Sequence, residues 1–160
     1  MENLREFFTE EETKDIVDAI KIAEKNTSGE IRVHLEKSSG KEPLKKIREI
    51  FIKIGMRKTE LKNGILFFLS IEDKQFTILG DDGINKKVPK DFWDNVKNII
   101  IENFKNGDFS KGLSEGIIMA GEQLSTFFPY EKGDINELSD NISYGDELEE
   151  NKNEGEKNEK

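Results

Sequence analysis

Apolar residues recur along this chain at two spacings, every third or fourth residue in some segments and every second residue in others. The helical spacing predicts helices over residues 9–29, 43–56, 90–107 and 110–128. Thr9 and Glu12 have the spacing of a capping box at the start of the first helix. Pro43 favours the first turn of the second helix. Strands are predicted over 30–37 and, as a hairpin, over 63–80.

The two strand segments differ in how their polar residues are arranged. Residues 30–37 alternate apolar and polar side chains, which predicts a strand with one face in the core and one in solvent. His34 falls on the polar face, and we interpret it as solvated rather than as a ligand. The stretch GILFFLSI (64–71) is apolar on both faces and therefore belongs in the middle of a sheet. A tight turn near Asp73 joins it to the second arm of the hairpin.

The predicted order of elements is helix, strand, helix, two strands and two helices. This order indicates a single α/β domain with a small mixed sheet and helices on both faces. The first two strands are joined by a helical crossover, which makes them parallel if they are neighbours. The second arm of the hairpin returns antiparallel to the first.

The C-terminal part differs from the rest of the chain in charge. The whole chain has a net charge of −9, and residues 131–160 hold 11 acidic and 4 basic residues, a net of −7. We therefore divide the chain into a domain over 1–130, an extension over 131–145 and an acidic tail over 146–160. Apolar residues in the extension can dock it on the domain; they are Ile135, Leu138, Ile142 and Tyr144. The tail has too few apolar residues to offset its ordering entropy, and we expect it to be disordered.

Composition excludes several classes of function. The chain has no cysteine, which removes disulfides, thiolate metal sites and cysteine nucleophiles. No basic stripe with interleaved aromatic residues is present, so we expect no nucleic-acid partner. The longest apolar run, 64–71, is far shorter than the roughly 20 residues of a membrane span. The acidic start of the chain does not resemble a signal peptide, and we expect a cytoplasmic monomer.

The predicted topology brings four oxygen-bearing side chains to one end of the sheet. If the hairpin turn is centred near Asp73, Asp82 lies opposite Gly64 and Asp81 lies near Ile65. The first parallel strand begins at this same end. The residues gathered there are Glu30, Asn63, Asp81 and Asp82. Carboxylate and amide oxygens are the ligands that Ca²⁺ and Mg²⁺ prefer, and a cation would relieve the repulsion among the carboxylates.

A structural role is an alternative for each aspartate. Asp81 and Asp82 precede a glycine after a strand, which is ordinary turn chemistry, and the two interpretations stay open. For Asp73, in the hairpin turn at the opposite end of the sheet, the turn role is favoured over cation binding. No nucleophile elbow, phosphate-binding glycine loop or EF-hand is present.

Four segments together resemble the TPM domain, a family named after plant photosystem II repair proteins and animal acetylcholine-receptor-associated proteins. The segments are TSGEIRVHLE (27–36), NGILFFLSIEDKQFTILGDDGI (63–84), FKNGDFSKGLSEGI (104–117) and, near the end, FP (128–129) with NELSDNIS (136–143). The resemblance spans about residues 5–145 and is closest to stand-alone bacterial members. It implies a Rossmann-like α/β/α sandwich, divalent-cation binding by acidic loop residues, and the acid phosphatase activity described for plant members. Asp91 falls near an aspartate of the family pattern and is a further candidate ligand, whereas GDDGIN (80–85) replaces the glycine-rich loop of many members.

Two classes of function follow. The favoured one is a domain that binds Ca²⁺ or Mg²⁺ weakly and serves as an interaction module in assembling or maintaining a protein complex. The alternative is a metal-dependent acid phosphatase acting on phosphate monoesters, which needs a positive clamp or an activated nucleophile. Near the proposed site only Arg32, Lys86 and Lys87 could supply positive charge.

Overall fold

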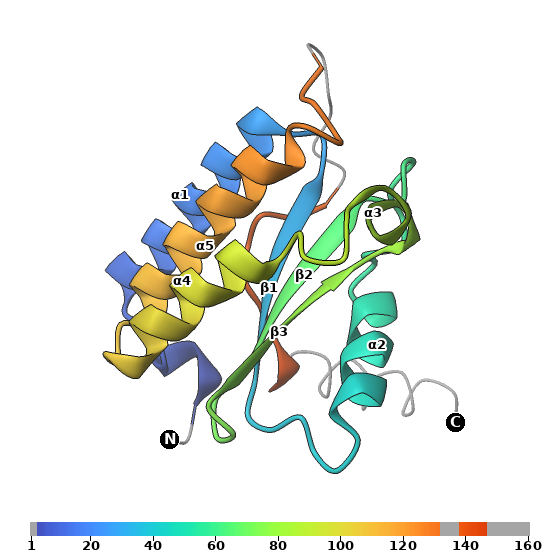
Figure 1. Cartoon of the computed structure of the whole chain (residues 1–160). Coiled ribbons are helices and arrows are strands. Elements are labelled where there is room, and N and C mark those ends of the chain that lie inside the picture. The colour runs from blue at the N-terminus through green and yellow to red at the C-terminus, as the bar shows by residue number, and fades with distance from the viewer. Residues whose placement is uncertain (1–2, 132–137, 147–160) are drawn as a thin grey trace, which may run out of the picture.

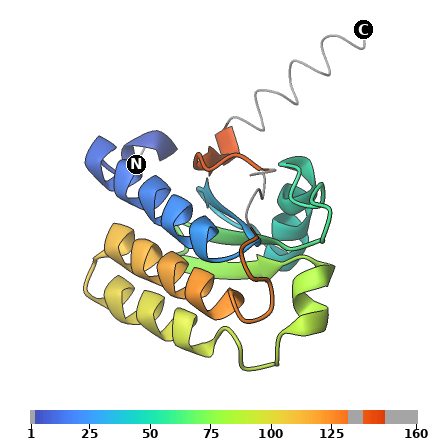
Figure 2. The same ribbon diagram turned by 90° about the horizontal axis from the view of Figure 1, so that it is seen from above.

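A four-stranded sheet lies between two helical layers in the computed structural model, which describes residues 3–131 and 138–146 (Figures 1 and 2). The α/β sandwich predicted from the sequence is confirmed. In chain order the elements are η1 (Leu4–Glu6), α1 (Glu10–Asn26), β1 (Glu30–Glu36), α2 (Pro43–Lys53), β2 (Gly64–Ser70), β3 (Gln75–Gly80), α3 (Asp82–Lys87), α4 (Asp94–Lys105), α5 (Phe109–Leu124) and β4 (Ser143–Tyr144).

The strands are ordered β3-β2-β1-β4. β1 is parallel to β2, and β3 is antiparallel to β2, as the sequence predicts. The hairpin register differs from the prediction by one residue, so that Asp81 rather than Asp82 lies opposite Gly64 and donates its backbone N–H to the Gly64 carbonyl at 2.9 Å. The short strand β4 was not predicted; it runs parallel to β1 and pairs with His34 and Leu35.

Three helices cover one face of the sheet, with α5 between α1 and α4 (Figure 2). The predicted capping box of Thr9 and Glu12 starts α1, with both reciprocal hydrogen bonds at 3.0 Å. Small residues in α5 allow its neighbours to approach closely. A Cβ at Gly116 would lie 2.6 Å from Ile100 of α4, and one at Gly121 would lie 2.7 Å from Ala23 of α1. The small residues of α5 therefore serve helix packing.

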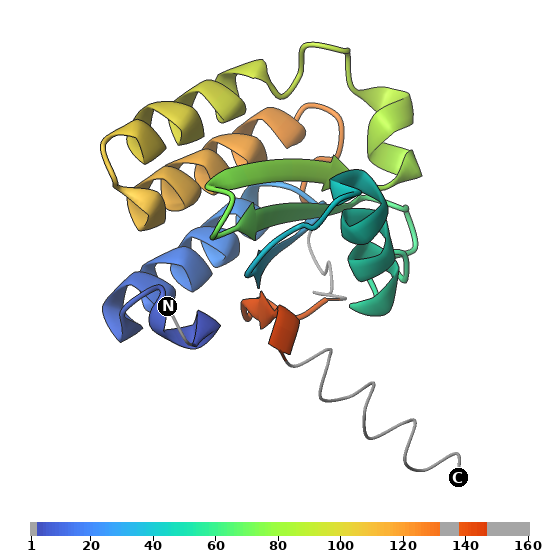
Figure 3. The ribbon, with the colours of Figure 1, turned by 90° about the horizontal axis from the view of Figure 1, so that it is seen from below.

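The opposite face of the sheet is covered by α2 (Figure 3). Ile47 and Phe51 of α2 form a second apolar cluster with Leu66 and Phe68 of β2. This layer corrects the prediction for His34, which is fully buried rather than solvated. The alternation of β1 was interpreted correctly, but its polar face points into a covered layer and not into water.

The C-terminal extension packs on the body of the protein through residues 138–146. Ile142 is buried, and a Cβ at Gly145 would collide with the carboxylate of Glu36. The guanidinium of Arg5 is 2.6 Å from Asp146 and lies over the ring of Tyr144. The expected contacts of Ile135 and the expected disorder of 147–160 concern residues outside those that the structure describes.

The GDDGIN segment is not a loop, because a short helix begins there. Asp81 is the N-cap of α3, and its side chain accepts a hydrogen bond from the backbone N–H of Asp82 at 2.8 Å. Gly83 is required in this helix, since a Cβ there would collide with the Leu61 carbonyl. None of the helices in the described part of the chain is both long and apolar enough to cross a membrane.

Truncations test how much stability the extension supplies. A chain ending at Asp146 should melt close to the full chain, because the removed residues, 147–160, contain one apolar side chain, Leu148. A chain ending at Glu131 should lose at least about 2 kcal/mol, the contribution of one buried aliphatic side chain such as Ile142. Thermal melts followed by circular dichroism measure both. Equal melting temperatures for the two truncated chains would contradict a stabilising extension.

Candidate functional site

The strand ends bring the backbones of the predicted residues together at one end of the sheet. Glu30 begins β1 and donates its N–H to the carbonyl of Asn63, just before β2, at 3.2 Å. Asp81 follows β3 and pairs with Gly64. Glu30, Asn63 and Asp81 are all buried, and the side-chain amide of Asn63 donates to the Ser28 carbonyl at 3.1 Å.

Arg57 neutralises the two adjacent aspartates. Its Nε lies 3.5 Å from Asp81 Oδ1, and its Nη2 lies 3.2 Å from Asp82 Oδ2. Arg57 thus relieves the repulsion that the sequence analysis assumed, and it was not among the basic residues predicted near the site, which were Arg32, Lys86 and Lys87. Arg57 follows α2 in sequence, and only the packing of that layer against the sheet places it beside Asp81.

Two oxygen atoms at this end of the sheet are buried without a hydrogen-bond partner among the described residues. They are Oδ1 of Asn63 and Oδ2 of Asp81. A buried acceptor that makes no hydrogen bond costs about 1–3 kcal/mol. Either atom would therefore gain from a donor or a cation.

A pocket of about 300 Å³ opens beside Asp81. Its polar lining consists of Arg48, Arg57, Asp81, Asp82 and Asn85, and its apolar lining includes Phe51, Ile52 and Leu79. The two arginines come from the α2 layer, whereas the acidic residues follow β3. The pocket thus joins guanidinium groups, carboxylates and an apolar wall in one place.

A second acidic cluster lies at the same end of β1, on the side away from β2. Glu24 Oε2 accepts the backbone N–H of Ile31 at 3.2 Å, at a point where no strand of 3–131 or 138–146 pairs with this side of β1. Burial raises the pKa of the Glu24 carboxyl, and hydrogen bonds with Asp140 and Glu30 and the charges of these two groups raise it further, to about 11. One carboxyl group of this cluster therefore keeps its proton at neutral pH.

Sequence analysis found Glu30 but missed Glu24 and Asp140. Glu24 lies near the end of α1, and Asp140 lies in the extension. Neither position has a local sequence signal, because the cluster forms only when α1, β1 and the extension pack together. No three His, Cys, Asp or Glu side chains in 3–131 and 138–146 are already arranged to hold a metal ion.

Asp91, the further candidate, is exposed in the turn before α4. Its backbone carbonyl accepts the N–H of Asp94 at 3.1 Å. No contact in the described residues joins its carboxylate to Asp81 or Asp82. The structure therefore does not bring Asp91 into either acidic cluster.

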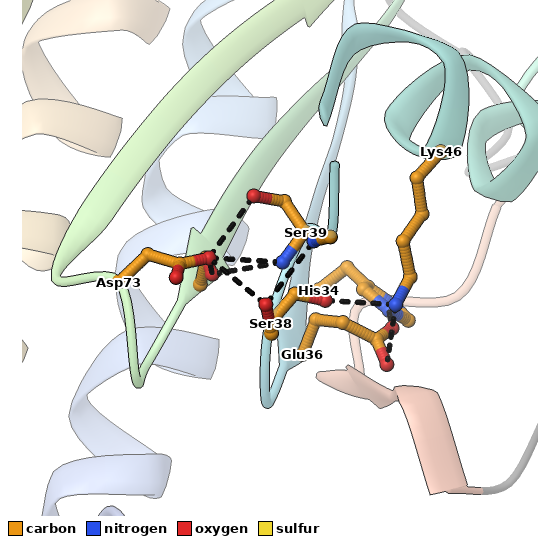
Figure 4. A network of polar contacts seen from close by, with 8 residues as sticks. His34, Glu36, Ser38, Ser39, Lys46 and Asp73 are labelled. Atoms are coloured by element: carbon orange, nitrogen blue, oxygen red, sulfur yellow. Dashed lines mark hydrogen bonds and ion pairs between the residues drawn. The ribbon is translucent and has the colours of Figure 1, made fainter. Parts of the chain in front are cut away.

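Asp73 lies at the opposite, carboxyl end of the parallel strands, and its carboxylate anchors the turn there (Figure 4). Its Oδ2 accepts hydrogen bonds from Ser70 Oγ at 2.5 Å, from Ser39 N at 3.0 Å and from the hydroxyls of Ser38 and Ser39. The Ser70 hydrogen bond and then those of Ser39 and Ser38 lower the pKa of Asp73 to about 2. These bonds give Asp73 a structural role that needs no cation.

The same end of β1 holds a buried polar chain that fixes the extension. His34 Nδ1 lies 2.7 Å from Ser143 Oγ, and His34 Nε2 lies 2.9 Å from Glu36 Oε2. Lys46 of α2 is 3.7 Å from the other oxygen of Glu36 (Figure 4). Ser143 is buried, so this chain of contacts resembles a structural clamp and not an accessible nucleophile with its base.

Comparison with known proteins supplies the family. The family model of the TPM domain matches residues 2–123. The chain belongs to the TPM domain family. No curated protein matches it.

Solved structures of bacterial proteins share the fold. The NMR structure of BA42 from the psychrophilic bacterium Bizionia argentinensis is 50% identical, with a TM-score of 0.85 over 91% of this chain and 100% of that one. The N-terminal domain of a P. gingivalis protein is 17% identical, with a TM-score of 0.63 over 78% of this TPM chain and 82% of that domain. The N-terminal domain of cg2496 from Corynebacterium glutamicum is 14% identical, with a TM-score of 0.58 over 86% and 80%. These two distant structures support the fold alone.

The raised pKa of Glu24 predicts how the stability of this TPM domain varies with pH. The folded state keeps a proton that the unfolded state releases above its pKa of about 4.5, so stability is full below that pH and falls as pH rises towards 11. One proton gives a slope of at most about 1.4 kcal/mol per pH unit. Glu24→Gln should flatten this fall, as measured by thermal or urea unfolding between pH 5 and pH 9.

Asp82→Asn is the matched control, because it removes one carboxylate from an exposed position. It should leave the slope between pH 5 and pH 9 unchanged. Parallel profiles for the wild-type chain and Glu24→Gln would contradict the shared proton.

Proposed function

We propose that this TPM domain binds a divalent cation, Ca²⁺ or Mg²⁺, at the cluster of Glu24, Glu30 and Asp140, and serves as an interaction module. The observation that carries the proposal is the position of Glu24, whose Oε2 accepts the N–H of Ile31 at 3.2 Å beside the buried Glu30. Burial and the neighbouring Asp140 and Glu30 raise the pKa of Glu24. Carboxyl groups come this close only with a proton or a cation between them, since their charges otherwise repel.

The chemistry of the donor atoms suits a hard cation, which would have to draw the three carboxylates together because they are not already arranged around one point. The cluster offers only carboxyl oxygens, which Ca²⁺ and Mg²⁺ prefer, and the chain has no cysteine to supply a thiolate. Asn63 precedes Gly64, the residue paired with Glu30, and carries a buried oxygen without a hydrogen-bond partner. The sequence-predicted pair Asp81 and Asp82 supports the proposal less, because Arg57 already neutralises both.

Cation binding at this cluster requires the release of a proton. One carboxyl group of the cluster keeps a proton at neutral pH, and it must lose that proton to bind a metal ion. The cation would supply the positive charge that the shared proton supplies in the free protein. Binding should therefore release a proton, and affinity should rise by up to about tenfold per pH unit below the pKa of Glu24.

A titration with Ca²⁺ and with Mg²⁺ tests the proposal. A weak site with a dissociation constant of roughly 10⁻⁴ to 10⁻³ M is expected. At about 100 times that concentration, the cation should stabilise the fold by about 2.7 kcal/mol, visible as a higher melting temperature. Amide shifts should centre on Glu24, Glu30 and Asp140, and proton release should be detectable in weak buffer.

Two matched variants assign the site. Asp140→Asn should remove most of the stabilisation by the cation, whereas Asp82→Asn should keep it. The reverse result, with loss in Asp82→Asn alone, would place the cation at Asp81 and Asp82, where α3 begins. Absence of any cation-dependent shift in the unmodified chain would refute cation binding altogether.

A metal-dependent phosphatase is the second candidate, and one observation favours it. Arg48 and Arg57 line the same pocket as Asp81 and Asp82, which supplies the positive clamp that sequence analysis did not find. Guanidinium groups bind phosphate oxygens with paired hydrogen bonds. Arg57 is engaged with both aspartates, so Arg48 is the guanidinium available to a phosphate monoester.

Turnover of p-nitrophenyl phosphate at acidic and neutral pH, with and without Mg²⁺, tests this second function. If the pocket hydrolyses phosphate esters, Arg48→Gln should lower the rate by at least about tenfold, since charge-assisted contacts contribute about 1.5–3 kcal/mol. Lys53→Gln, on the same helix but outside the pocket lining, is the control. Turnover that persists equally in Arg48→Gln would reject the pocket as its source.

A further inference from the structure

Strand β3 forms an edge of the sheet that lacks the usual protection against pairing. Among the residues that the structure describes, β3 has a strand neighbour on one side only, β2. Its sequence, QFTILG, contains no charged residue and no proline, and its register with β2 runs without a bulge. Natural edge strands commonly carry charges, prolines or bulges because an open edge binds other extended chains.

The backbone groups available at this edge follow from the ladder. Asp81 is hydrogen-bonded to Gly64, and alternate residues of β3 therefore point their N–H and C=O groups towards β2. Phe76, Ile78 and Gly80 point theirs outwards. The carbonyl of Gly80 accepts Asn85 Nδ2 at 3.1 Å, and within the described residues the outward groups of Phe76 and Ile78 have no hydrogen-bond partner.

A basic and apolar face of α2 lies next to the end of this edge. Ile52 is 61% exposed and lines the pocket together with Leu79 of β3 and Arg48. Arg48 is exposed, and no acidic group of the described chain lies within ion-pair distance of it. Residues 41–62 contain eight basic and three acidic residues, although the whole chain is acidic.

We propose that the free edge of β3 and the adjacent pocket bind an extended, acidic segment of a partner protein by strand addition. The segment would hydrogen-bond to the outward groups of Phe76 and Ile78. One acidic side chain would pair with Arg48, and an apolar side chain would pack on Ile52 and Leu79. This inference is independent of both the cation and phosphatase activity.

Charge decides between this partner and a second copy of the chain. Two copies paired antiparallel through β3 would form one continuous sheet, with both α2 helices on the same side. The basic segments 41–62 of the two copies would then lie on the same side of the joined sheet, where their like charge opposes pairing. At the pocket, Arg57 is paired with Asp81 and Asp82, so an acidic segment meets the positive charge of Arg48.

The full chain, labelled with ¹⁵N and kept in EDTA, is titrated with a short capped peptide of alternating glutamate and valine. EDTA makes the result independent of cation binding. Amide shifts should centre on 75–80 and on α2 near Arg48 and Ile52. Hydrogen exchange of Phe76 and Ile78 should slow when the peptide is bound, which docking of side chains alone would not cause.

Arg48→Glu should weaken peptide binding by about tenfold. Lys53→Glu is the matched control, because it makes the same charge change on the same helix outside the pocket lining. A peptide with lysine in place of glutamate should bind more weakly than the acidic one. Equal binding of the two peptides, equal effects of the two variants, or unchanged exchange at Phe76 and Ile78 would overturn the proposal. A concentration-dependent dimer that protects β3 amides without peptide would identify a second copy as the occupant instead.

Discussion

Burial of β2 along its whole length is the constraint on which the rest of this structure depends. All seven residues of Gly64–Ser70 are buried, so both faces of the sheet must be covered. The α1, α5 and α4 layer covers one face, and α2 covers the other. Because β1 lies beside β2, its polar face is enclosed as well, and each polar side chain on it needs a partner from another element.

Those partnerships explain the polar networks at the two ends of β1. At the carboxyl end, His34 is held by Ser143 of β4 and by Glu36. At the amino end, Glu30 is enclosed with Glu24 and Asp140, and one carboxyl group stays protonated. In both places the extension supplies one member of the network. The extension thus supplies the hydrogen-bond partners that allow the polar face of β1 to be buried.

Sequence patterns predicted the elements that depend on local chemistry. The capping box of α1, the apolar run of β2 and the hairpin to β3 each have a signal within a few residues. The burial of His34 had no such local signal, because alternation shows which side chains share a face of the strand but does not show what covers that face. The helix α3 was missed because Asp-Asp-Gly suits both a turn and a capped helix start.

The candidate site shows the same division between local and tertiary information. Strand pairing was enough to place Glu30, Asn63 and Asp81 at one end of the sheet. It could not find three other residues, because they come from elements that no strand pairing brings together. Arg57 comes from the segment after α2, Glu24 from α1 and Asp140 from the extension. Here the missing residues change the chemistry. Arg57 removes the repulsion that first suggested a cation at Asp81 and Asp82, while Glu24 and Asp140 create it beside Glu30.

The position of Asp140 links the proposed cation to the fold. Asp140 lies between Leu138, which packs on the α2 cluster, and Ile142, which is buried in the main core. Under the proposed function, a cation bound by Asp140 and by Glu24 of α1 would hold the extension against the body. Coupling between two equilibria is reciprocal, so a docked extension would in turn raise the affinity for the cation. Through the carboxyl cluster, binding of the cation and docking of the C-terminal extension on the sheet would then stabilise each other.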